Sequence, residues 1–267
     1  MSLSAIVLTC NEALNIAECV DNLSFANEIL VVDSESSDGT PEIAKAHGAR
    51  VVTHPFSDFA AQRNFAMSQA IGDWCFFIDA DERVTPKLAE EIRTVSKGSV
   101  GLSPPAERPA LCVYSIPFQT FFFGKRLRFG DARLEFHIRL FPKRHVQWDQ
   151  PVHEKIVTDL PCRKLKNSIW HYTTRDFAHY MAKVERYVPR ELAVMKQKGI
   201  KPSLLRAVVV PPAKFFQLYF CKLGIFDGIA GFQYAILSAY YAFEKYWRYW
   251  RLGEKTLSCH HAKYSKS

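Results

Sequence analysis

The stretch that decides the fold is Trp74-Cys75-Phe76-Phe77-Ile78-Asp79-Ala80-Asp81-Glu82. Its apolar run leads without a break into two carboxylates, Asp79 and Asp81, one residue apart. Such a run predicts a strand buried on both faces, as in a parallel sheet. The two acids then lie where the strand leaves the sheet, which is where open α/β sheets bind their ligands.

The charges of Asp79 and Asp81 repel each other and require compensation. Mg²⁺ or Mn²⁺ would supply it, because these ions prefer oxygen ligands and are often held by one or two carboxylates together with substrate phosphates. The sequence therefore predicts a divalent-cation site at this acid pair. The alternative is a solvated acidic turn after a strand.

Strand patterns and helix patterns alternate through the first hundred or so residues. Apolar runs at 5–9, 28–33 and 51–53 predict three more strands. The intervening helices are expected at residues 11–23, 40–48, 59–70 and, after the acid pair, 85–95. This alternation is typical of βαβ units, so we expect an α/β fold with a mostly parallel central sheet.

The chain changes character after a Gly/Ser/Pro-rich break at residues 98–109. Strand-like segments at 112–123 and 139–141 precede an amphipathic helical pattern from 176 to about 198. Residues 204–250 are dense in Phe, Tyr and Trp and are broken by Pro211-Pro212. We expect three parts: an α/β half at 1–100, a second half of the same domain at 101–174, and a helical C-terminal extension at 175–267.

Composition narrows the class of protein. The seven cysteines are scattered without a Cys-x-x-Cys pair, which argues against a zinc knuckle and fits reduced thiols in the cytosol. The start of the chain lacks the pattern of a secretory signal. No stretch reaches the ~18 uncharged apolar residues of a membrane span, and residues 228–243 come nearest.

Phosphate-binding glycine loops are absent, since the chain has neither Gly-x-Gly-x-x-Gly nor Gly-Lys-Ser/Thr. This argues against dinucleotide oxidoreductases and P-loop enzymes. Polar residues recur instead at strand ends, at Thr9, Asn11 and Asp33. A carboxylate such as Asp33 can accept from a base N–H or a ribose hydroxyl, although each of these residues alone suits a turn or a cap. Arg63 suits phosphate or carbonyl recognition, or is a surface charge of a helix.

Taken in order, four segments resemble family 2 glycosyltransferases. They are Val7-Leu8-Thr9-Cys10-Asn11-Glu12, then Ile29-Leu30-Val31-Val32-Asp33-Ser34 with Ser37-Asp38-Gly39-Thr40, then Arg63-Asn64, and Asp79-Ala80-Asp81-Glu82. The resemblance implies a GT-A fold, a nucleotide-binding α/β sandwich, and transfer from a nucleotide-activated sugar, usually with inversion. It implies nucleoside contacts from Thr9, Asn11, Glu12, Asp33 and Arg63, and assigns Asp79 and Asp81 to the ribose, diphosphate and metal.

The second half is similar to the lipopolysaccharide core glucosyltransferase subgroup. This similarity rests on Phe123-Gly124, Arg139-Leu140-Phe141, Pro151-Val152-His153-Glu154, Gly224-Ile225-Phe226-Asp227-Gly228 and Gly231-Phe232. Acceptors in the family include many sugars and lipids, so the fold does not identify the sugar.

Inverting transfer requires a carboxylate that takes the proton of the acceptor hydroxyl. Glu154 is the candidate base, beside His153 in an expected loop, and Asp149 and Asp131 are the reserves. His153 is a candidate ligand for the acceptor or the metal. Arg139 can brace the diphosphate through two hydrogen bonds, or simply pair with an acid.

The C-terminal third is basic and aromatic. Its cations are Lys245, Arg248, Arg251, Lys255, Lys263 and Lys266. Such a tail suits an anionic surface, either lipid head groups or nucleic acid. On one helix the rings from Tyr240 to Trp250 cannot all face a single core, so we expect rings such as Trp247 and Trp250 to contact a membrane interface and the cations its phosphates. The alternative is a helical subdomain in which these rings are core.

Together these features predict a metal-dependent inverting glycosyltransferase, peripheral at the cytoplasmic face of a membrane. It would transfer a hexose, glucose from UDP-glucose, to a lipid-linked or lipopolysaccharide core acceptor. One alternative is a polyprenyl-phosphate sugar synthase, in which Glu154→Gln should have a mild effect. Others are a non-catalytic sugar-nucleotide-binding or membrane-scaffold protein, and a nucleotidyltransferase. Nucleic-acid binding is the weakest alternative, because no recognised module accompanies the basic tail.

Overall fold

The computed structural model describes residues 1–97, 111–130, 135–149 and 155–264, with side chains described as far as Gly253. The chain forms two compact units. The sheet unit comprises Met1–Gln119 and Leu134–His171, and the helical unit comprises Thr120–Arg133 and Tyr172–Ser267.

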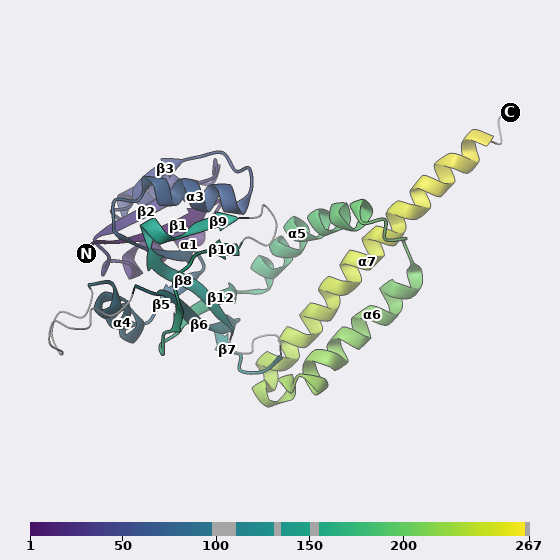
Figure 1. The fold of residues 1–267 in the computed structure, drawn as a ribbon. Coiled ribbons are helices and arrows are strands. Elements are labelled where there is room, and N and C mark those ends of the chain that lie inside the picture. The colour runs from purple at the N-terminus through teal and green to yellow at the C-terminus, as the bar shows by residue number, and fades with distance from the viewer. Residues whose placement is uncertain (98–110, 131–134, 150–154, 265–267) are drawn as a thin grey trace. The chain divides into compact units, whose positions relative to one another are not determined.

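The first four strands of the sheet unit are parallel, as the sequence predicts. They are β1 (Leu3–Thr9), β2 (Glu28–Asp33), β3 (Arg50–Thr53) and β4 (Trp74–Asp79), in the order β3-β2-β1-β4. The helices between and after them are α1 (Ala13–Asn22), α2 (Thr40–Ala46), α3 (Phe59–Gln69) and α4 (Pro86–Ser96) (Figure 1). Asp58 and Thr85 cap α3 and α4 by accepting hydrogen bonds from backbone N–H groups of their first turns.

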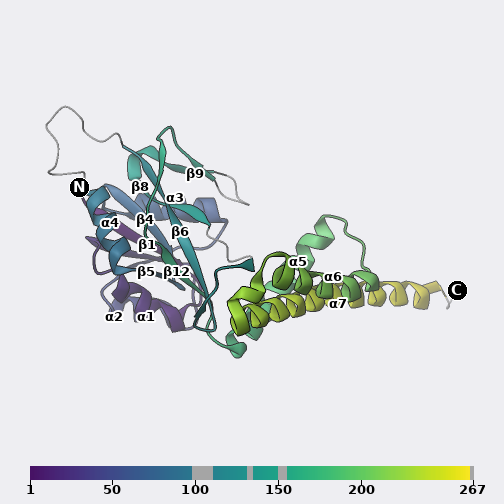
Figure 2. The same cartoon turned by 90° about the horizontal axis from the view of Figure 1, so that it is seen from below.

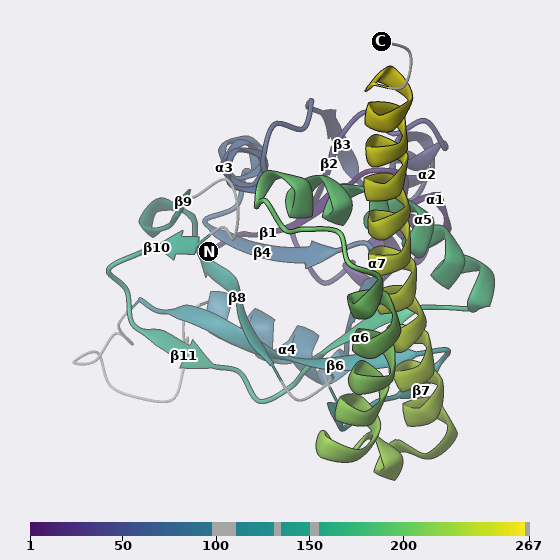
Figure 3. The ribbon, with the colours of Figure 1, turned by 90° about the vertical axis from the view of Figure 1, so that its right-hand side faces the viewer.

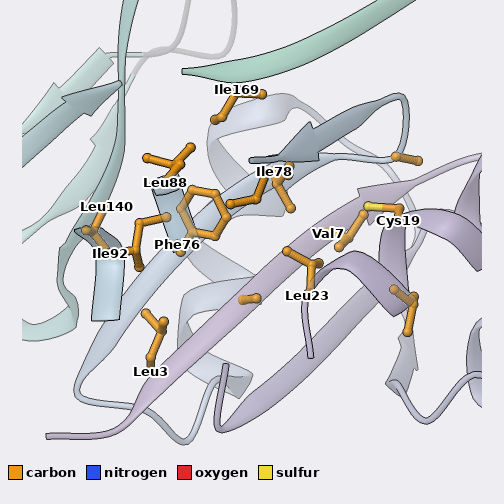
Figure 4. Close-up of a cluster of buried hydrophobic side chains, with 14 of the residues drawn as sticks. Leu3, Val7, Cys19, Leu23, Phe76, Ile78, Leu88, Ile92, Leu140 and Ile169 are labelled. Atoms are coloured by element: carbon orange, nitrogen blue, oxygen red, sulfur yellow. The ribbon is translucent and has the colours of Figure 1, made fainter. Parts of the chain in front are cut away.

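Both faces of this sheet are buried, which explains the unbroken apolar runs. Alternate residues of β4 point to opposite faces, so Phe76 and Ile78 pack with α1 and α4, while Cys75 and Phe77 pack with α3. Figure 4 shows Phe76 enclosed by Leu88 and Ile92 of α4, among other apolar side chains. Figure 2 shows α1, α2 and α4 on one side of the strands and α3 on the other. The α/β fold class is confirmed.

The sheet continues beyond β4 with strands from the second half of the unit. β8 (Phe136–Pro142) runs antiparallel beside β4, and β6 (Val113–Phe122), β12 (Ile169–Thr174) and β5 (Glu82–Val84) follow. Short strands β11 (Cys162–Lys164), β9 (Gln147–Asp149) and β10 (Lys155–Val157) and the 3-10 turn η2 (Lys143–His145) complete the unit. This continuation brings Arg139 and His171 to the carboxyl end of β4, because β8 pairs with β4 and His171 pairs with Glu82.

The helical unit contains three long helices and a short strand, β7 (Lys125–Arg126), that pairs with the end of β6. The helices are α5 (Phe177–Gln197), α6 (Leu204–Phe216) and α7 (Gly228–Tyr264), with a π turn, η3 (Gln217–Cys221), and a 3-10 turn, η4 (Gly224–Asp227), between the last two. Figures 1 and 3 show α6 and α7 side by side as a hairpin. Pro211 and Pro212 lie inside α6, so they do not end the helix.

α5 packs against α7 through an apolar cluster that includes Val184, Val188 and Tyr249. Around this cluster, Lys245 Nζ lies 2.9 Å from Glu191 Oε2 and Arg248 Nη1 lies 2.8 Å from Glu185 Oε2. Both cations thus pair with carboxylates of α5, and Arg248 also pairs with Glu244 of its own helix at 2.7 Å. Their contact with membrane phosphates stays a prediction.

Glycines fix the two ends of the α6–α7 hairpin. A Cβ atom on Gly231 would lie 1.9 Å from the backbone oxygen of Gly224, and one on Gly253 would lie 2.7 Å from Pro202 Cγ. Asp227 accepts hydrogen bonds from the backbone N–H groups of Arg128 and Phe129, at 3.1 and 2.9 Å. The turn between the helices is thus tightly packed and anchored to the loop after β7.

One segment among the described residues, Leu204–Cys221, is long and apolar enough to cross a membrane by length and composition. It contains two charged residues, Arg206 and Lys214, which is why a search for uncharged runs passes over it. It lies in α6 and η3, and not at residues 228–243.

Candidate active site

Asp33 ends β2 and organises the loop that follows it. Its Oδ1 accepts hydrogen bonds from Thr9 Oγ1 at 3.0 Å and from Ser36 Oγ at 2.6 Å, and its Oδ2 accepts one from the Ser36 backbone N–H at 2.8 Å. Both Thr9 and Asp33 are buried. The parallel pairing of β1 with β2 sets Thr9 opposite Asp33, and this pairing explains why the two strand-end residues meet.

Asn11 and Glu12 hold the other side of the same loop. Asn11 adopts a left-handed backbone conformation with φ of 59°, which asparagine tolerates better than most residues. Its side-chain Oδ1 accepts from the backbone N–H of Ser37 at 2.9 Å, and the N–H of Glu12 donates to Thr40 Oγ1 at 2.8 Å. Four of the five residues expected at the nucleoside, all but Arg63, therefore lie together, joined through residues 36–40.

Arg63 lies on α3 and is held by aromatic rings. Its guanidinium carbon lies 4.6 Å from the centroid of the Trp148 ring and 5.3 Å from that of Phe77, a cation–π arrangement. The side-chain amide of Asn64 exchanges two hydrogen bonds with the backbone of Trp148, at 2.8 and 3.0 Å, which fixes α3 to β9. Arg63 is buried, so it is not the exposed helix charge that the sequence left as an alternative.

The acid pair lies next to an arginine. Arg139 Nη2 donates to Asp79 Oδ2 at 3.1 Å and to Glu82 Oε1 at 2.9 Å, and Glu82 Oε2 accepts from the Asp79 backbone N–H at 2.9 Å. Glu82 is fully buried and Arg139 is nine-tenths buried, whereas the Asp79 side chain is about half exposed. The other guanidinium nitrogen of Arg139, Nη1, is buried and has no hydrogen-bond partner among the residues that the structure describes. A buried donor in this state is costly unless an acceptor reaches it.

These neighbours shift the pKa values of the two acids in opposite directions. Burial raises the pKa of Glu82, with Arg139 opposing the rise and the charge of Asp79 adding to it. Burial also acts against ionisation of Asp79, but Arg139 and then Arg63 outweigh it and hold the pKa of Asp79 below its usual range. Of the two acids, Asp79 is therefore the one whose ionised form the surroundings favour.

Asp81 faces a histidine contributed by β12. His171 Nε2 lies 3.4 Å from Asp81 Oδ2, and both side chains are partly exposed. Burial lowers the pKa of His171, but the hydrogen bond and charge of Asp81 outweigh it, so the pKa is raised. The repulsion expected between Asp79 and Asp81 is thus compensated by Arg139 and His171, both of which come from strands far along the chain.

The donor set of this site suits a divalent cation at Asp81 better than at Asp79. Asp79 already accepts a hydrogen bond from Arg139, whereas Asp81 presents a partly exposed carboxylate beside the imidazole of His171. Among the described residues no group of three or more His, Cys, Asp or Glu side chains is placed to hold a metal. One carboxylate fits a cation whose other ligands are substrate phosphates and water.

Sequence reasoning missed Glu82 and His171. Glu82 directly follows Asp81, and its position three residues after Asp79, where the strand ends, could have indicated that it belongs to the site. His171 stands alone in a Trp-His-Tyr segment, and only the pairing of β12 with β5 brings it to Asp81. Asp149 ends β9 and is exposed. Glu154, His153 and Asp131 lie outside the described residues.

The site lies at the carboxyl ends of parallel strands and is built from the polar loop after β2 and the acids after β4. This arrangement is typical of one class of protein, the α/β enzymes. The model of glycosyl transferase family 2 matches residues 4–105, so the chain carries a domain of this family, and it is a glycosyltransferase. The match includes Thr9, Asp33, Arg63, Asp79 and Asp81.

Similar proteins extend the comparison over nearly the whole chain. A lipopolysaccharide core biosynthesis glycosyltransferase, LpsC, of Rhizobium meliloti is 29% identical over 91% of this chain and 90% of its own. An uncharacterised glycosyltransferase of Rickettsia bellii is 27% identical over 97% and 89%.

Solved structures resemble the chain less closely. Mannosyl-3-phosphoglycerate synthase from Rubrobacter xylanophilus matches with a TM-score of 0.34 and 25% identity, over 44% of this chain and 40% of that chain. Glucosyl-3-phosphoglycerate synthase from Mycobacterium tuberculosis, in complex with Mn²⁺, UDP and phosphoglyceric acid, matches with a TM-score of 0.33 and 22% identity, over 45% and 43%. The chain thus spans less than half the length of these solved structures.

Proposed function

We propose that the chain is an inverting, metal-dependent transferase that moves a hexose, glucose from UDP-glucose, to a lipid-linked or lipopolysaccharide core acceptor. The observation that carries the proposal is the buried Nη1 of Arg139, which has no hydrogen-bond partner among the described residues and lies beside the acid pair Asp79 and Asp81. An anionic donor phosphate would satisfy this nitrogen, and a cation on Asp81 would let the phosphate approach the acids.

The donor would lie along the carboxyl ends of β1, β2 and β4. The loop held by Asp33, Thr9 and Asn11 would receive the nucleoside, and the ordered backbone there supports that role because a preformed loop loses little entropy on binding. Arg63, fixed between two rings, places its charge toward the same edge. Asp79 and Arg139 would lie at the diphosphate.

The chemistry is attack of an acceptor hydroxyl on the anomeric carbon, with loss of the nucleoside diphosphate. A cation held by Asp81, when bound, would offset the charge that develops on the leaving diphosphate. Arg139 would stabilise the same charge through its free nitrogen, because an aligned donor in a buried site needs no rearrangement during reaction. Glu154 remains the proposed base that takes the hydroxyl proton.

The acceptor is proposed from the relative in Rhizobium meliloti, whose printed name places it in lipopolysaccharide core biosynthesis. A lipid-linked acceptor requires the enzyme to work at a membrane surface. We therefore propose a peripheral location at the cytoplasmic face of the membrane.

A donor screen tests this function. Purified protein with Mg²⁺ or Mn²⁺ is offered a panel of nucleotide sugars with lipid-linked saccharide acceptors, and release of nucleoside diphosphate is measured. UDP-glucose should give the fastest release. Release that is independent of the donor offered, or release of pyrophosphate, would overturn the proposal.

Asp81→Asn, with Asp73→Asn as its matched control, tests the metal. Asp73 comes directly before β4, at the end of the strand opposite to Asp81. Asp81→Asn should lower release by about 100-fold or more, the usual effect of losing a group that stabilises transition-state charge. It should also weaken Mn²⁺ binding measured by electron paramagnetic resonance. Asp73→Asn should match the unaltered protein in both measurements.

A further inference from the structure

The α6–α7 hairpin has an apolar face that no described residue of the helical unit covers. On α6, Leu205, Val208, Val209, Pro212 and Phe216 are exposed at a spacing that sets them on one side of the helix. The exposed fraction is 69% for Leu205 and 62% for Val208. We call this the hairpin face, together with its continuation at the turn and the start of α7: Phe220, Leu223, Ile225, Phe226, Ile229, Phe232 and Ile236.

The opposite side of the same helices is buried with small residues. Ala207 and Pro211 of α6 are buried, as are Ala230, Ala235 and Ala239 of α7. The two helices therefore pack closely on their small residues and turn their large apolar side chains outward. In a helix pair of a soluble protein the large apolar side chains ordinarily pack between the helices. Here they point away from the partner helix, which indicates that the hairpin face contacts another apolar surface.

The charges around the hairpin face are of one sign. From Gly199 to Phe226 the chain carries Lys201, Arg206, Lys214 and Lys222 and no acid. The next acid, Asp227, is occupied by the backbone N–H groups of Arg128 and Phe129. An apolar face with cations and no acids complements an anionic lipid surface, whose head groups attract Lys and Arg near the interface.

We propose that the hairpin face binds the surface of an anionic lipid bilayer, with α6 lying in the plane of the interface. In-plane binding is favoured over spanning because Lys214 falls near the middle of Leu204–Cys221, where a charge in the hydrocarbon centre is costly. The inference deepens the proposed function and rests on it for its biological setting. It replaces the stretch around Trp247 and Trp250 as the expected contact.

The test is flotation of the full chain with vesicles of phosphatidylcholine alone or mixed with phosphatidylglycerol. The matched pair is Val208→Asp on the hairpin face and Val194→Asp on α5, which exchanges another exposed valine, at 45%, elsewhere in the same unit. Val208→Asp should weaken partition into mixed vesicles about tenfold or more, since a charge replaces an inserted side chain. Val194→Asp should behave as the unaltered protein. Ile229→Ser provides a second, milder variant on α7 and should also weaken partition.

A second pair separates the charge contribution. Arg206→Gln should lower binding to mixed vesicles about fivefold and leave binding to neutral vesicles unchanged, while Arg186→Gln on α5 should change neither.

The flotation assay contains no sugar donor. Vesicle binding can therefore fail while sugar transfer succeeds, and sugar transfer can fail while vesicle binding succeeds. Failure of the unaltered protein to float with mixed vesicles at low salt overturns the proposal. Equal loss in Val208→Asp and Val194→Asp overturns it as well. So does a Val208→Asp variant that still floats but dissociates from oligomer to monomer, because the face would then join copies of the chain.

Discussion

The two ends of the parallel strands both bury a glutamate, and the two glutamates differ in how they are satisfied. At the amino end, Glu28 is bound by the hydroxyl of Ser4, by Arg50 through two nitrogens at 2.9 and 2.6 Å, and by the backbone N–H of Ile71 at 2.8 Å. At the carboxyl end, Glu82 shares one arginine with Asp79, and that arginine keeps a donor without a partner.

The pKa values follow this difference. Burial acts against ionisation of Glu28, but the hydrogen bonds of Ser4, Ile71 and Arg50 together lower its pKa. Burial dominates at Glu82 and raises its pKa. The amino end is a completed network that stabilises the sheet, whereas the carboxyl end is incomplete without another charged group. An incomplete polar network inside a folded protein marks the end where a ligand binds.

Arg139→Met should show the largest effect. It leaves Asp79 and Glu82 without their cation, and removing one partner of a buried ion pair typically costs about 3–5 kcal/mol. Unfolding by urea, followed by tryptophan fluorescence, measures the loss. Arg139→Lys should retain most of the stability but lower transfer, because Lys cannot present two aligned donors. A stable and active Arg139→Met protein would show that the carboxyl end is as complete as the amino end.

Glu28→Gln should cost about 1–3 kcal/mol at neutral pH, the usual loss when a buried hydrogen-bonded group is replaced imperfectly. Transfer should remain unchanged. Because the folded pKa of Glu28 lies below its unfolded value of 4.5, its carboxylate stabilises the fold above that pH. This contribution is lost as the pH falls through the folded pKa. The stability gap between Glu28→Gln and the unaltered protein should therefore close on acidification, and a constant gap from pH 7 to pH 3 would contradict the assignment.

Asp33→Ala tests the acid at the carboxyl end of β2. Its expected effect lies between those of Arg139→Met and Glu185→Gln. The oxygens of Asp33 accept two hydrogen bonds from Ser36 in the loop and one from Thr9 at the end of β1, so its loss should disorder the nucleoside site and weaken UDP binding by about 1–3 kcal/mol. Titration calorimetry measures the affinity. Thr9→Val, which removes one of those hydrogen bonds, should give a smaller loss. Unchanged affinity in both variants would place the nucleoside elsewhere.

Glu185→Gln should have the smallest effect. Glu185 pairs with Arg248 through both oxygens, whereas Glu28 accepts both hydrogen bonds of Arg50 on Oε1, and the side chain of Glu185 is exposed. Exposed ion pairs contribute little because water screens them. Differential scanning calorimetry should find no measurable change in Tm, and a clear drop would show that pairing geometry matters more than burial.

The sequence predicts the local part of this structure well. Apolar runs and capping residues predict β1, β2 and β4 and helices α1 to α4, because each depends on residues near one another in the chain. The convergence of Thr9 with Asp33 also follows, since parallel pairing aligns strand ends. The acids after β4 are visible for the same reason.

The partners of those acids could not be predicted. Arg139 reaches Asp79 because β8 inserts beside β4, and His171 reaches Asp81 through the register of β12 with β5. Such pairings depend on tertiary packing, which residue patterns within one segment do not encode. The same limit applies to Lys245 and Arg248, whose spacing fits a basic surface but whose carboxylates lie on another helix.

The glycines at the two ends of the α6–α7 hairpin have a mechanical consequence. A side chain at position 231 would clash with Gly224 in the turn, and one at position 253 would clash with Pro202 at the open end, so larger residues at either position would push these segments apart. Between these two close approaches, the hairpin bends most easily at Pro211-Pro212, because prolines donate no backbone hydrogen bonds.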